Sequence, residues 1–300
     1  MDWNKKEDVL NEVRKDGYNL RYASEELKND KEVVNRAICN DSWAFQFASK
    51  TLQDDKELVM RAVKQNGYAL EFVSDRLKDD EKVVLRACKQ NANALQFASE
   101  NMRNNDNIVM TAIRQNGRAI EFADDTLKDN KKFALEAVTN DGESLRFLSD
   151  RLRNDKEFFQ EAYKIYPSAL KFAGNEIKDN KEIVMEIIKN NGRNLAFVSD
   201  RLKDNKEIVL EACKNLCWLL PTASERLRND KDIALEVCKN DKLAFEYLGD
   251  KIKEQFPTIE ALLDSEKKIS KNNQWSKETE DKTNTWNDKV NSDKDNQWEI

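Results

Sequence analysis

The chain has 300 residues, of which 36% are charged and 39% hydrophobic, and its formal net charge is −6. No global positive field therefore draws it to nucleic acid or to anionic lipid. The sequence contains no histidine, which removes the usual general base and the commonest metal ligand. We therefore expect no enzyme, no cofactor and no metal site.

The sequence also indicates where the protein works. Its first eight residues hold no apolar signal core, and no run of eighteen apolar residues occurs. We expect a soluble, cytoplasmic monomer with reduced thiols. Non-classical secretion as an effector stays open.

A fixed period of 25 residues organises the chain. A string resembling Leu-Lys-Asp-Asn begins at Leu27, Leu52, Leu77, Met102, Leu127, Leu152, Ile177, Leu202, Leu227 and, in degraded form, Ile252. Such a period is typical of arrays in which each unit stacks on its neighbours. The sequence predicts an all-α solenoid of about ten 25-residue helix–turn–helix repeats over residues 2–251.

The unit that begins at Leu52 shows how a repeat is built. Asp55 is placed to cap a first helix over residues 56–64. The apolar face of that helix holds Leu58, Val59, Ala62 and Val63. Gly67 is expected to end the helix by taking the left-handed conformation.

A second helix of about ten residues is predicted next, with a buried side made of Ala69, Leu70, Phe72, Val73 and Leu77. Lys78 and Asp79 then turn the chain into the next cap, Asp80. Helices this short are marginal alone, so stability must come from stacking.

Several segments depart from the pattern. Pro167 replaces the turn glycine of one unit, and residues 216–221 form an unusually apolar segment broken by Pro221. The segment at 216–221 suggests a kink or a local contact site. Residues 252–264 are predicted to form a last helix that covers the open end of the stack, with Pro257 in its first turn.

The recurring strings Leu-Lys-Asp-Asn-Lys-Glu-Ile-Val and Asn-Gly-Tyr-Ala-Leu-Glu-Phe-Val-Ser-Asp-Arg-Leu resemble the repeats of Domain of Unknown Function 4116. The resemblance covers residues 2–251, and the family's domain of about fifty residues would correspond to two units. It implies a helical repeat, and it brings no catalytic or binding residue with it.

Three cysteines occupy a core position. Cys88, Cys213 and Cys238 stand where valine or isoleucine stands in other units, so we predict that they are buried. Cys213 and Cys217 lie one helical turn apart like half a metal site, but no second pair accompanies them.

The second position of each unit is basic almost throughout, and Ser-Asp or Ser-Glu pairs precede the end of several units, as at Ser74, Ser99, Ser149 and Ser199. We interpret these as turn residues and solvated charge pairs between repeats. The alternative is that the second-position side chains form an extended row of positive charge for a linear anionic ligand.

Two rows vary along the array. The tenth-position row reads Asn11, Arg36, Arg61, Arg86, Thr111, Glu136, Glu161, Glu186, Glu211 and Glu236. Its change from Arg to Glu fits block duplication, drift or a bipolar partner-binding surface. The turn-following row reads Tyr18, Trp43, Tyr68, Asn93, Arg118, Glu143, Ser168, Arg193, Trp218 and Leu243. Its first three aromatics are either interface anchors or packing over the neighbouring turn.

Residues 265–300 form a polar tail that we expect to be disordered. It holds three Asn-x-Trp motifs, ending at Trp275, Trp286 and Trp298. These are either repeated short binding motifs that raise avidity, a remnant of repeat expansion, or Trp side chains that fold back on the solenoid.

The sequence favours a non-catalytic protein–protein interaction scaffold that binds a protein or peptide on the solenoid surface. The alternatives are a nucleic-acid-binding repeat protein, which the charge makes less favourable, or a secreted or viral effector that binds host proteins.

Overall fold

The computed structural model describes residues 1–214 and 216–266, and all regular structure among them is helical. The chain separates into two compact units. Unit 1 comprises Met1–Ile177, and unit 2 begins at Lys178. Each unit is described by itself below.

Each repeat consists of a long α-helix, a 3₁₀ helix (η) and a short α-helix, and the described residues hold ten such repeats. The long helices are α1 (Lys6–Lys15), α3 (Lys31–Asn40), α5 (Lys56–Gln65), α7 (Glu81–Gln90), α9 (Asp106–Gln115), α11 (Lys131–Asn140), α13 (Lys156–Ile165), α15 (Lys181–Asn190), α17 (Lys206–Cys213) and α19 (Lys231–Asn240). The 3₁₀ helices are η1 (Gly17–Tyr22), η2 (Ser42–Phe47), η3 (Gly67–Phe72), η4 (Ala92–Phe97), η5 (Gly117–Phe122), η6 (Gly142–Phe147), η7 (Ala169–Phe172), η8 (Gly192–Phe197), η9 (Cys217–Thr222) and η10 (Lys242–Tyr247). The short helices are α2 (Glu25–Lys28), α4 (Lys50–Gln53), α6 (Asp75–Lys78), α8 (Glu100–Arg103), α10 (Asp125–Lys128), α12 (Asp150–Asn154), α14 (Asn175–Lys178), α16 (Asp200–Lys203), α18 (Glu225–Arg228) and α20 (Asp250–Gln255).

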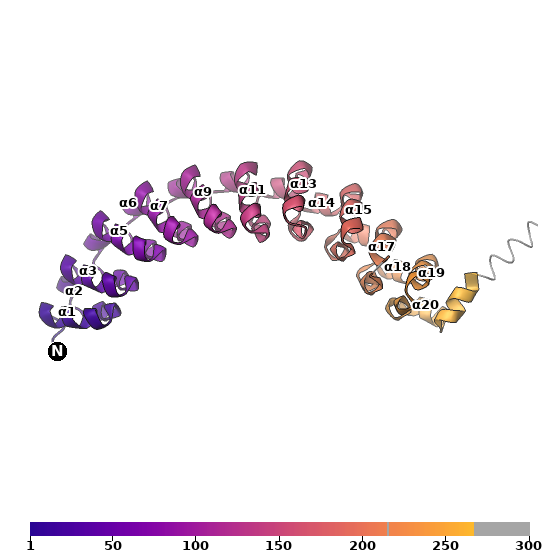
Figure 1. Cartoon of the computed structure of the whole chain (residues 1–300), viewed down its shortest axis with the longest axis horizontal. Helices are drawn as coiled ribbons and strands as arrows, with labels where there is room; N and C mark the ends of the chain where they lie inside the picture. The colour runs from indigo at the N-terminus through magenta and orange to yellow at the C-terminus, as the bar shows by residue number, and fades with distance from the viewer. Residues whose placement is uncertain (215, 267–300) are drawn as a thin grey trace, which may run out of the picture. The chain divides into compact units, whose positions relative to one another are not determined.

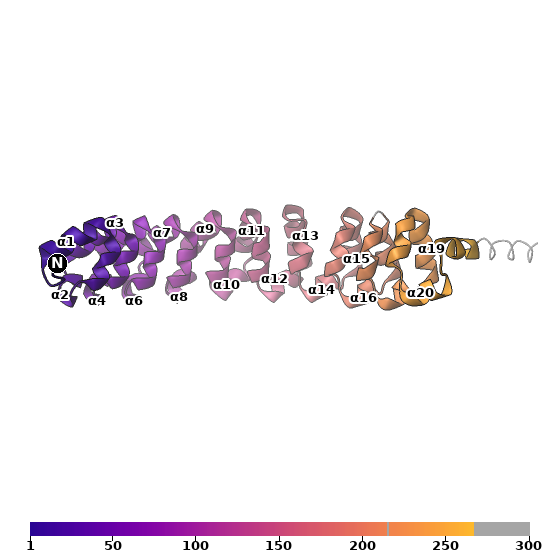
Figure 2. The same ribbon diagram turned by 90° about the horizontal axis from the view of Figure 1, so that it is seen from below.

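The all-α repeat fold with a 25-residue period is confirmed. Within each unit, long helices pack on long helices and η helices pack on η helices, so the repeats stack in register (Figure 1). Figure 2 shows the long helices of unit 1 along one edge and its short helices along the other. The core lies between these layers. In α5 the buried residues are Leu58, Val59, Ala62 and Val63, as predicted.

The second helix of the repeat differs from the prediction. The expected ten-residue helix is divided into η3 and α6, because Val73 and Ser74 are extended, with ψ of 150° and 152°. Ser74 then starts a new helix, and its Oγ accepts a hydrogen bond from the Leu77 N–H at 3.4 Å. The division leaves Phe72 half-buried, whereas we predicted a core residue.

The role predicted for Gly67 was wrong. No residue in the described part of the chain has a positive φ, so Gly67 does not end α5 in the left-handed conformation. It is small because the next repeat lies close, and a Cβ there would be 2.5 Å from the Ala87 carbonyl oxygen. The glycine therefore serves packing between repeats.

The predicted cap is confirmed, and it also joins repeats. Asp55 Oδ1 accepts a hydrogen bond from the Leu58 N–H at 3.0 Å. Lys31, at the start of the preceding long helix, bonds to Asp55 at 2.8 Å and to Glu57 at 3.0 Å. The hydrogen bond from Lys31 holds the pKa of Asp55 below its usual value, and the hydrogen bond from the Leu58 amide adds a smaller effect in the same direction. Lys6, Lys56 and Lys206 bridge to the next repeat in the same way.

A second connection, which we call the clamp, joins an aspartate after one short helix to the start of the next. Asp54 accepts hydrogen bonds from Ser74 Oγ and, at 3.1 Å, from Arg76 Nε. Beside it, the Ser74 N–H donates to the Gln53 carbonyl at 3.1 Å. Further clamps of this kind are built on Asp129, Asp179 and Asp204. They match the predicted charge pairs between repeats, but the partners, 20 and 22 residues apart, were not foreseen.

A third connection uses an amide side chain at the end of a long helix. Asn140 Oδ1 accepts from the Gly117 N–H at 3.0 Å, and its Nδ2 donates to the Arg114 carbonyl at 2.8 Å. Asn40 and Gln90 make equivalent pairs of bonds. The N–H groups of the buried glycines are thereby satisfied. This role was not predicted from the sequence.

The irregular segments distort their repeats. In the repeat of Pro167, η7 has only four residues and its N-cap side chain makes no hydrogen bond. In the repeat of Pro221, α17 ends at Cys213, two residues earlier than other long helices. Residues 259–266 form a last helix with Leu262 buried. This helix begins later than predicted, because residues 252–255 belong to α20 and Pro257 lies in the non-helical segment between the two helices. Two residues that we had assigned to the tail, Ser265 and Glu266, are thus helical.

Candidate functional site

The η helices present the turn-following row. Most side chains in this row are oriented by the capping residue before them, because a side-chain oxygen of that residue accepts a hydrogen bond from their backbone amide; the repeats of η7 and η9 lack this bond. Asp41 Oδ1 accepts from the Trp43 N–H at 2.9 Å, and Asn66 Oδ1 accepts from the Tyr68 N–H at 3.0 Å. The backbone is thus fixed while the ring projects from the η layer.

In unit 1 the first three members of this row pack against the phenylalanine that ends the next η helix. The ring centroids are 4.9 Å apart for Tyr18 and Phe47, 6.3 Å for Trp43 and Phe72, and 6.0 Å for Tyr68 and Phe97. All three pairs meet edge to face, a favourable geometry for aromatic rings. Packing over the neighbouring turn is therefore one role of these residues, yet Trp43 keeps 42% of its surface exposed.

Exposed large hydrophobic side chains are concentrated on the η helices. Of the eight that occur among the described residues, six lie there: Tyr22, Trp43, Phe197, Trp218, Leu243 and Tyr247. We call the surface formed by these helices the η face. In unit 2 it carries the last four of the six, and Arg193 lies over the Trp218 ring at 5.6 Å.

The η face of unit 1 becomes polar toward its later repeats. Arg118 Nε bonds to Asp141 at 2.7 Å, and Arg118 Nη2 bonds to Glu143 at 2.8 Å. The hydrogen bond that Arg118 donates to Asp141 raises the pKa of Arg118. Asn93 and Ser168 hold the row's other positions there. The aromatic surface of unit 1 is therefore confined to its first repeats.

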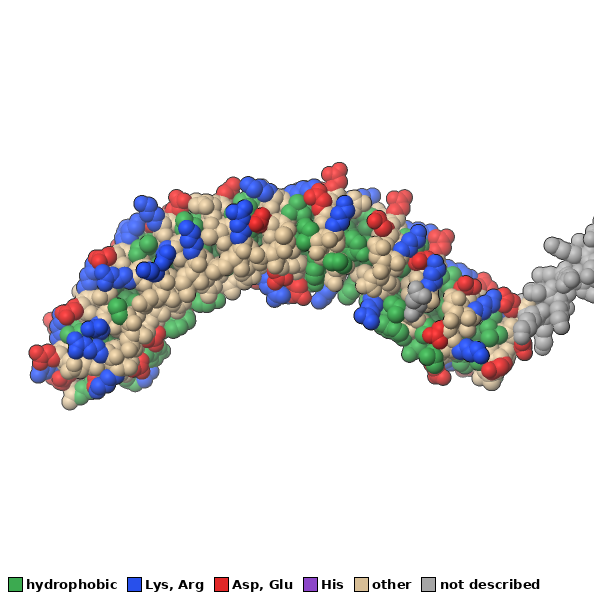
Figure 3. All heavy atoms as spheres, in the orientation of Figure 1, with side chains coloured by type: hydrophobic (Ala, Val, Ile, Leu, Met, Phe, Trp, Pro, Cys, Tyr) green, Lys and Arg blue, Asp and Glu red, His purple; other side chains and the backbone are tan. Residues whose placement is uncertain are grey.

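The tenth-position row lies on the exposed side of the long helices. Arg61 and Arg86 line one groove of about 800 Å³ between α5 and α7, together with Lys56, Glu57, Met60 and Lys64. Arg61 also bonds to Asn35 and to Glu57, both at 2.9 Å. Lys and Arg side chains gather over this part of unit 1 in Figure 3. Arg36 stands at the equivalent position of α3.

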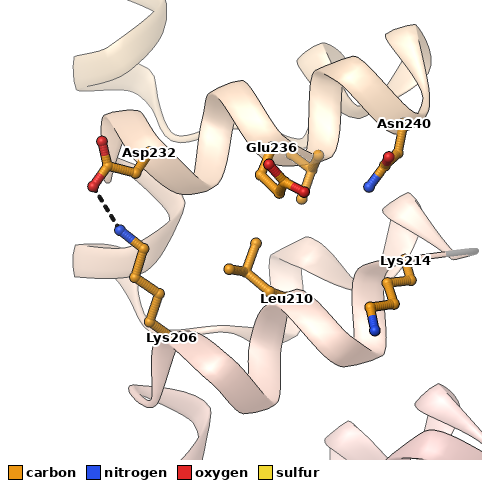
Figure 4. A pocket seen from close by; sticks show the side chains of 7 residues that line it. Lys206, Leu210, Lys214, Asp232, Glu236 and Asn240 are labelled. Carbon is orange, nitrogen blue, oxygen red and sulfur yellow. Dashed lines mark hydrogen bonds and ion pairs between the residues drawn. The ribbon is translucent and has the colours of Figure 1, made fainter.

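The acidic members of the row have mixed surroundings. Glu136 pairs with Arg114 at 2.9 Å, and Glu161 pairs with Lys131 at 2.7 Å. In unit 2, Glu186 is exposed on α15, and Glu211 pairs with Lys214 at 2.5 Å. Glu236 lines a groove of about 640 Å³ between α17 and α19. Figure 4 shows Leu210 between the two helices and Lys206 joined to Asp232, at 2.7 Å.

The cysteines at the core position are buried, as predicted. Burial raises the pKa of the Cys88 and Cys213 thiols to about 12 and that of Cys238 to about 11. Cys217 donates to Asp241 Oδ2 at 3.1 Å. Within the described ranges no three Cys, Asp or Glu side chains form a group that could hold a metal ion. These thiols are thus packed into the stack.

Several of the basic side chains at the second position of the units have local partners. Lys28 pairs with Glu25 at 2.9 Å, Lys128 with Asp125 at 3.1 Å and Lys203 with Asp200 at 3.3 Å. These pairs fit the interpretation as solvated charges. The three tail residues Trp275, Trp286 and Trp298 lie outside the described residues.

No helix in the described part of the chain is both long and apolar enough to cross a membrane. No curated protein and no solved structure matches the chain. One family model matches seven segments: residues 6–53, 30–78, 55–103, 80–128, 130–178, 180–221 and 205–253. Most of these segments run from the start of one long helix to the end of the second short helix that follows, so each spans two structural repeats. The chain therefore belongs to the family described as Domain of unknown function (DUF4116).

Proposed function

We propose that the protein is a non-catalytic scaffold that binds a protein or peptide on its η face. The observation that carries the proposal is the concentration of exposed aromatic and aliphatic side chains on the η helices. Large aromatic rings held on a rigid backbone lose little entropy on binding, and they are frequent hot spots of protein interfaces.

The charged residues support this assignment because most of those with resolved partners hold the array together. Asp55 caps a helix and pairs with Lys31, and Asp54 belongs to a clamp. Hydrogen bonds lower the pKa of both carboxylates. The largest effect on Asp55 comes from Lys31, and the largest effect on Asp54 comes from Ser74. A carboxylate held in its charged form by such bonds is a poor proton donor near neutral pH.

The test compares one pair of side chains with a single control side chain of similar exposure. Trp43 and Trp218 are 42% and 45% exposed on the η face, whereas Ile165 is 43% exposed at the end of a long helix. The double variant W43S/W218S and the control I165S are used as bait in quantitative affinity purification from cells that express the protein. A third bait lacks residues 267–300.

We expect W43S/W218S to lose at least about tenfold of each specific partner and I165S to retain it. Thermal melting of both variants checks that the fold is kept. Unchanged capture by W43S/W218S would exclude the η face as the contact surface. Loss only on removal of residues 267–300 would place binding in the tail.

A further inference from the structure

The exposed side of α3, α5 and α7 carries cations that the array does not use. Within the described residues, five of their Lys and Arg side chains have no ion pair: Arg36, Lys64, Lys82, Arg86 and Lys89. The acids of the same helices are mostly engaged, since Glu32 pairs with Lys6 and Glu57 with Lys31. We call this surface of the three long helices the basic ridge.

The groove between α5 and α7 gives the basic ridge a shape. Met60 provides an apolar part of its lining, and Lys56 is already bound to Asp80 at 2.5 Å. Lys64 and Arg86 line the same groove and have no carboxylate partner in the described part of the chain. The groove thus offers two free cations beside an apolar side chain.

The equivalent groove of unit 2 shows that the repeat fold does not require this charge. Lys206, Leu210 and Lys214 occupy the positions of Lys56, Met60 and Lys64, six repeats later. However, Asp232 and Glu236 replace Lys82 and Arg86 (Figure 4). Equivalent pairs of long helices thus pack whether the groove between them carries basic or acidic side chains at these positions. The basic side chains in unit 1 are therefore not needed for the fold and are available for binding.

We propose that the basic ridge binds an extended acidic segment of a partner protein. Packed helices lie roughly 8–10 Å apart. Three residues of a polyproline II segment span about 9 Å and complete one turn, so every third side chain lies on the same side. Carboxylates at every third residue would therefore meet Arg36, Arg61 and Arg86 in turn. Guanidinium groups suit carboxylates because they can donate two parallel hydrogen bonds.

A protein segment fits this surface better than a nucleic acid does. Glu57 and Glu81 interrupt the cations, and Met60 adds an apolar contact. A continuous run of phosphates would meet repulsion at each acid, whereas a peptide can place neutral residues there. The inference deepens the proposed scaffold function by naming a partner class, and it rests on residues outside the η face.

The experiment measures fluorescence anisotropy of a labelled peptide with glutamate at every third residue, titrated with the full-length protein. A peptide with the same glutamates in one block tests register, and a labelled oligothymidine of equal charge tests nucleic acid. The variant K64E/R86E is compared with K156E/K164E, which makes the same change of charge on α13. Lys164 holds the repeat position of Lys64, so the control is matched in place as well.

We expect K64E/R86E to weaken binding of the spaced peptide at least about tenfold and K156E/K164E to weaken it less than about twofold. Binding of the wild type should fall as NaCl rises from 50 to 150 mM. The variant D232K/E236R, which copies the basic groove into unit 2, should bind the spaced peptide more tightly than the wild type.

Equal losses in both double variants, tighter binding of the block peptide or of oligothymidine, or no binding at all would overturn the proposal. The η-face variant W43S/W218S separates the two proposals. It should bind the spaced peptide unchanged, so failure of the η face leaves the basic ridge standing, and failure of the ridge leaves the η face untouched.

Discussion

The Arg76 side chain binds both the carboxylate and the backbone carbonyl of Asp54, which lies in the preceding repeat. Its Nε lies 3.1 and 3.3 Å from the two carboxylate oxygens, and its Nη2 donates to the Asp54 carbonyl at 2.9 Å. Arg151, Arg201 and Arg226 repeat this geometry on Asp129, Asp179 and Asp204. The clamp therefore fixes the angle at which one short helix follows another.

The clamps should make stability depend on acid pH. Hydrogen bonds from Ser74 and Arg76 lower the pKa of Asp54. A carboxylate with a lowered folded-state pKa stabilises the fold above its unfolded pKa, near 4, and the stabilisation is lost as pH falls through the folded value. The variant D54N/D129N/D179N/D204N should melt roughly 2–4 °C lower at pH 7 and converge with the wild type as pH falls through the lowered pKa values of the four carboxyl groups.

The control for the clamps removes the same charge from four exposed first-turn aspartates, Asp75, Asp125, Asp150 and Asp200. Thermal melts of the three proteins from pH 7 to pH 2.5 provide the comparison. A difference between clamp variant and wild type that stays constant over this range would contradict the linkage.

The amide connection predicts a larger local effect. Replacing Asn140 by Leu removes the acceptor of the buried Gly117 N–H and the donor to the Arg114 carbonyl. Because a buried donor is left unsatisfied, we expect the free energy of unfolding to fall by about 1–3 kcal/mol. Urea denaturation measures it, with T139A as the neighbouring control. Hydrogen exchange at the Gly117 amide should accelerate in N140L, and an unchanged rate there would refute the role.

Ile165 occupies the position that Asn140 and Gln90 hold in their repeats, and it is exposed. The substitution I165N should supply a side chain able to bind the Gly142 N–H, as Asn140 binds that of Gly117. We expect stabilisation of about 0.5–1.5 kcal/mol, the value of a typical hydrogen bond. The variant I165S, which cannot reach as far, is the comparison, and equal stability of the two would argue against the added bonds.

The thiols should differ sharply in reactivity. Cys39 is exposed, whereas burial raises the pKa of Cys88 and Cys213 to about 12 and that of Cys238 to about 11. Since the thiolate is the reactive form, iodoacetamide at pH 8 should label Cys39 in the native protein and spare these three. Mass spectrometry of tryptic peptides gives the site. Rapid native labelling of Cys88 would contradict its place in the core.

The sequence predicted the features that depend on one repeat. The spacing of the apolar residues Leu58, Val59, Ala62 and Val63 predicts the buried face of a helix. The position of Asp55 just before that helix predicts its N-cap. Contacts that depend on two repeats were harder to predict. The Asp54–Arg76 clamp joins residues 22 apart, and Gly67 is required by a carbonyl of the next repeat. Rules based on neighbouring residues in the sequence predict neither the clamp nor this close approach. They therefore assign Gly67 to a left-handed turn.

The candidate surfaces were predictable in part. The rows were visible from the period, so Trp43 and Arg86 could be singled out without coordinates. Which cations are neutralised was not visible, because no pattern in the sequence marks that Lys31 meets carboxylates of the following repeat and that Lys82 does not. Unpaired charge is a property of the stack and needs the structure.

The backbone bond from the Ser74 N–H to the Gln53 carbonyl recurs at Ser99 and Lys78 with the same offset of 21 residues. Excision of any 25 consecutive residues inside the array returns each donor opposite an equivalent acceptor, whereas loss of 24 or 26 does not. Unequal recombination between repeats can thus change copy number without disturbing a single junction. The number of repeats in such a protein can therefore change during evolution, and the length of its binding surfaces changes by one 25-residue repeat at a time.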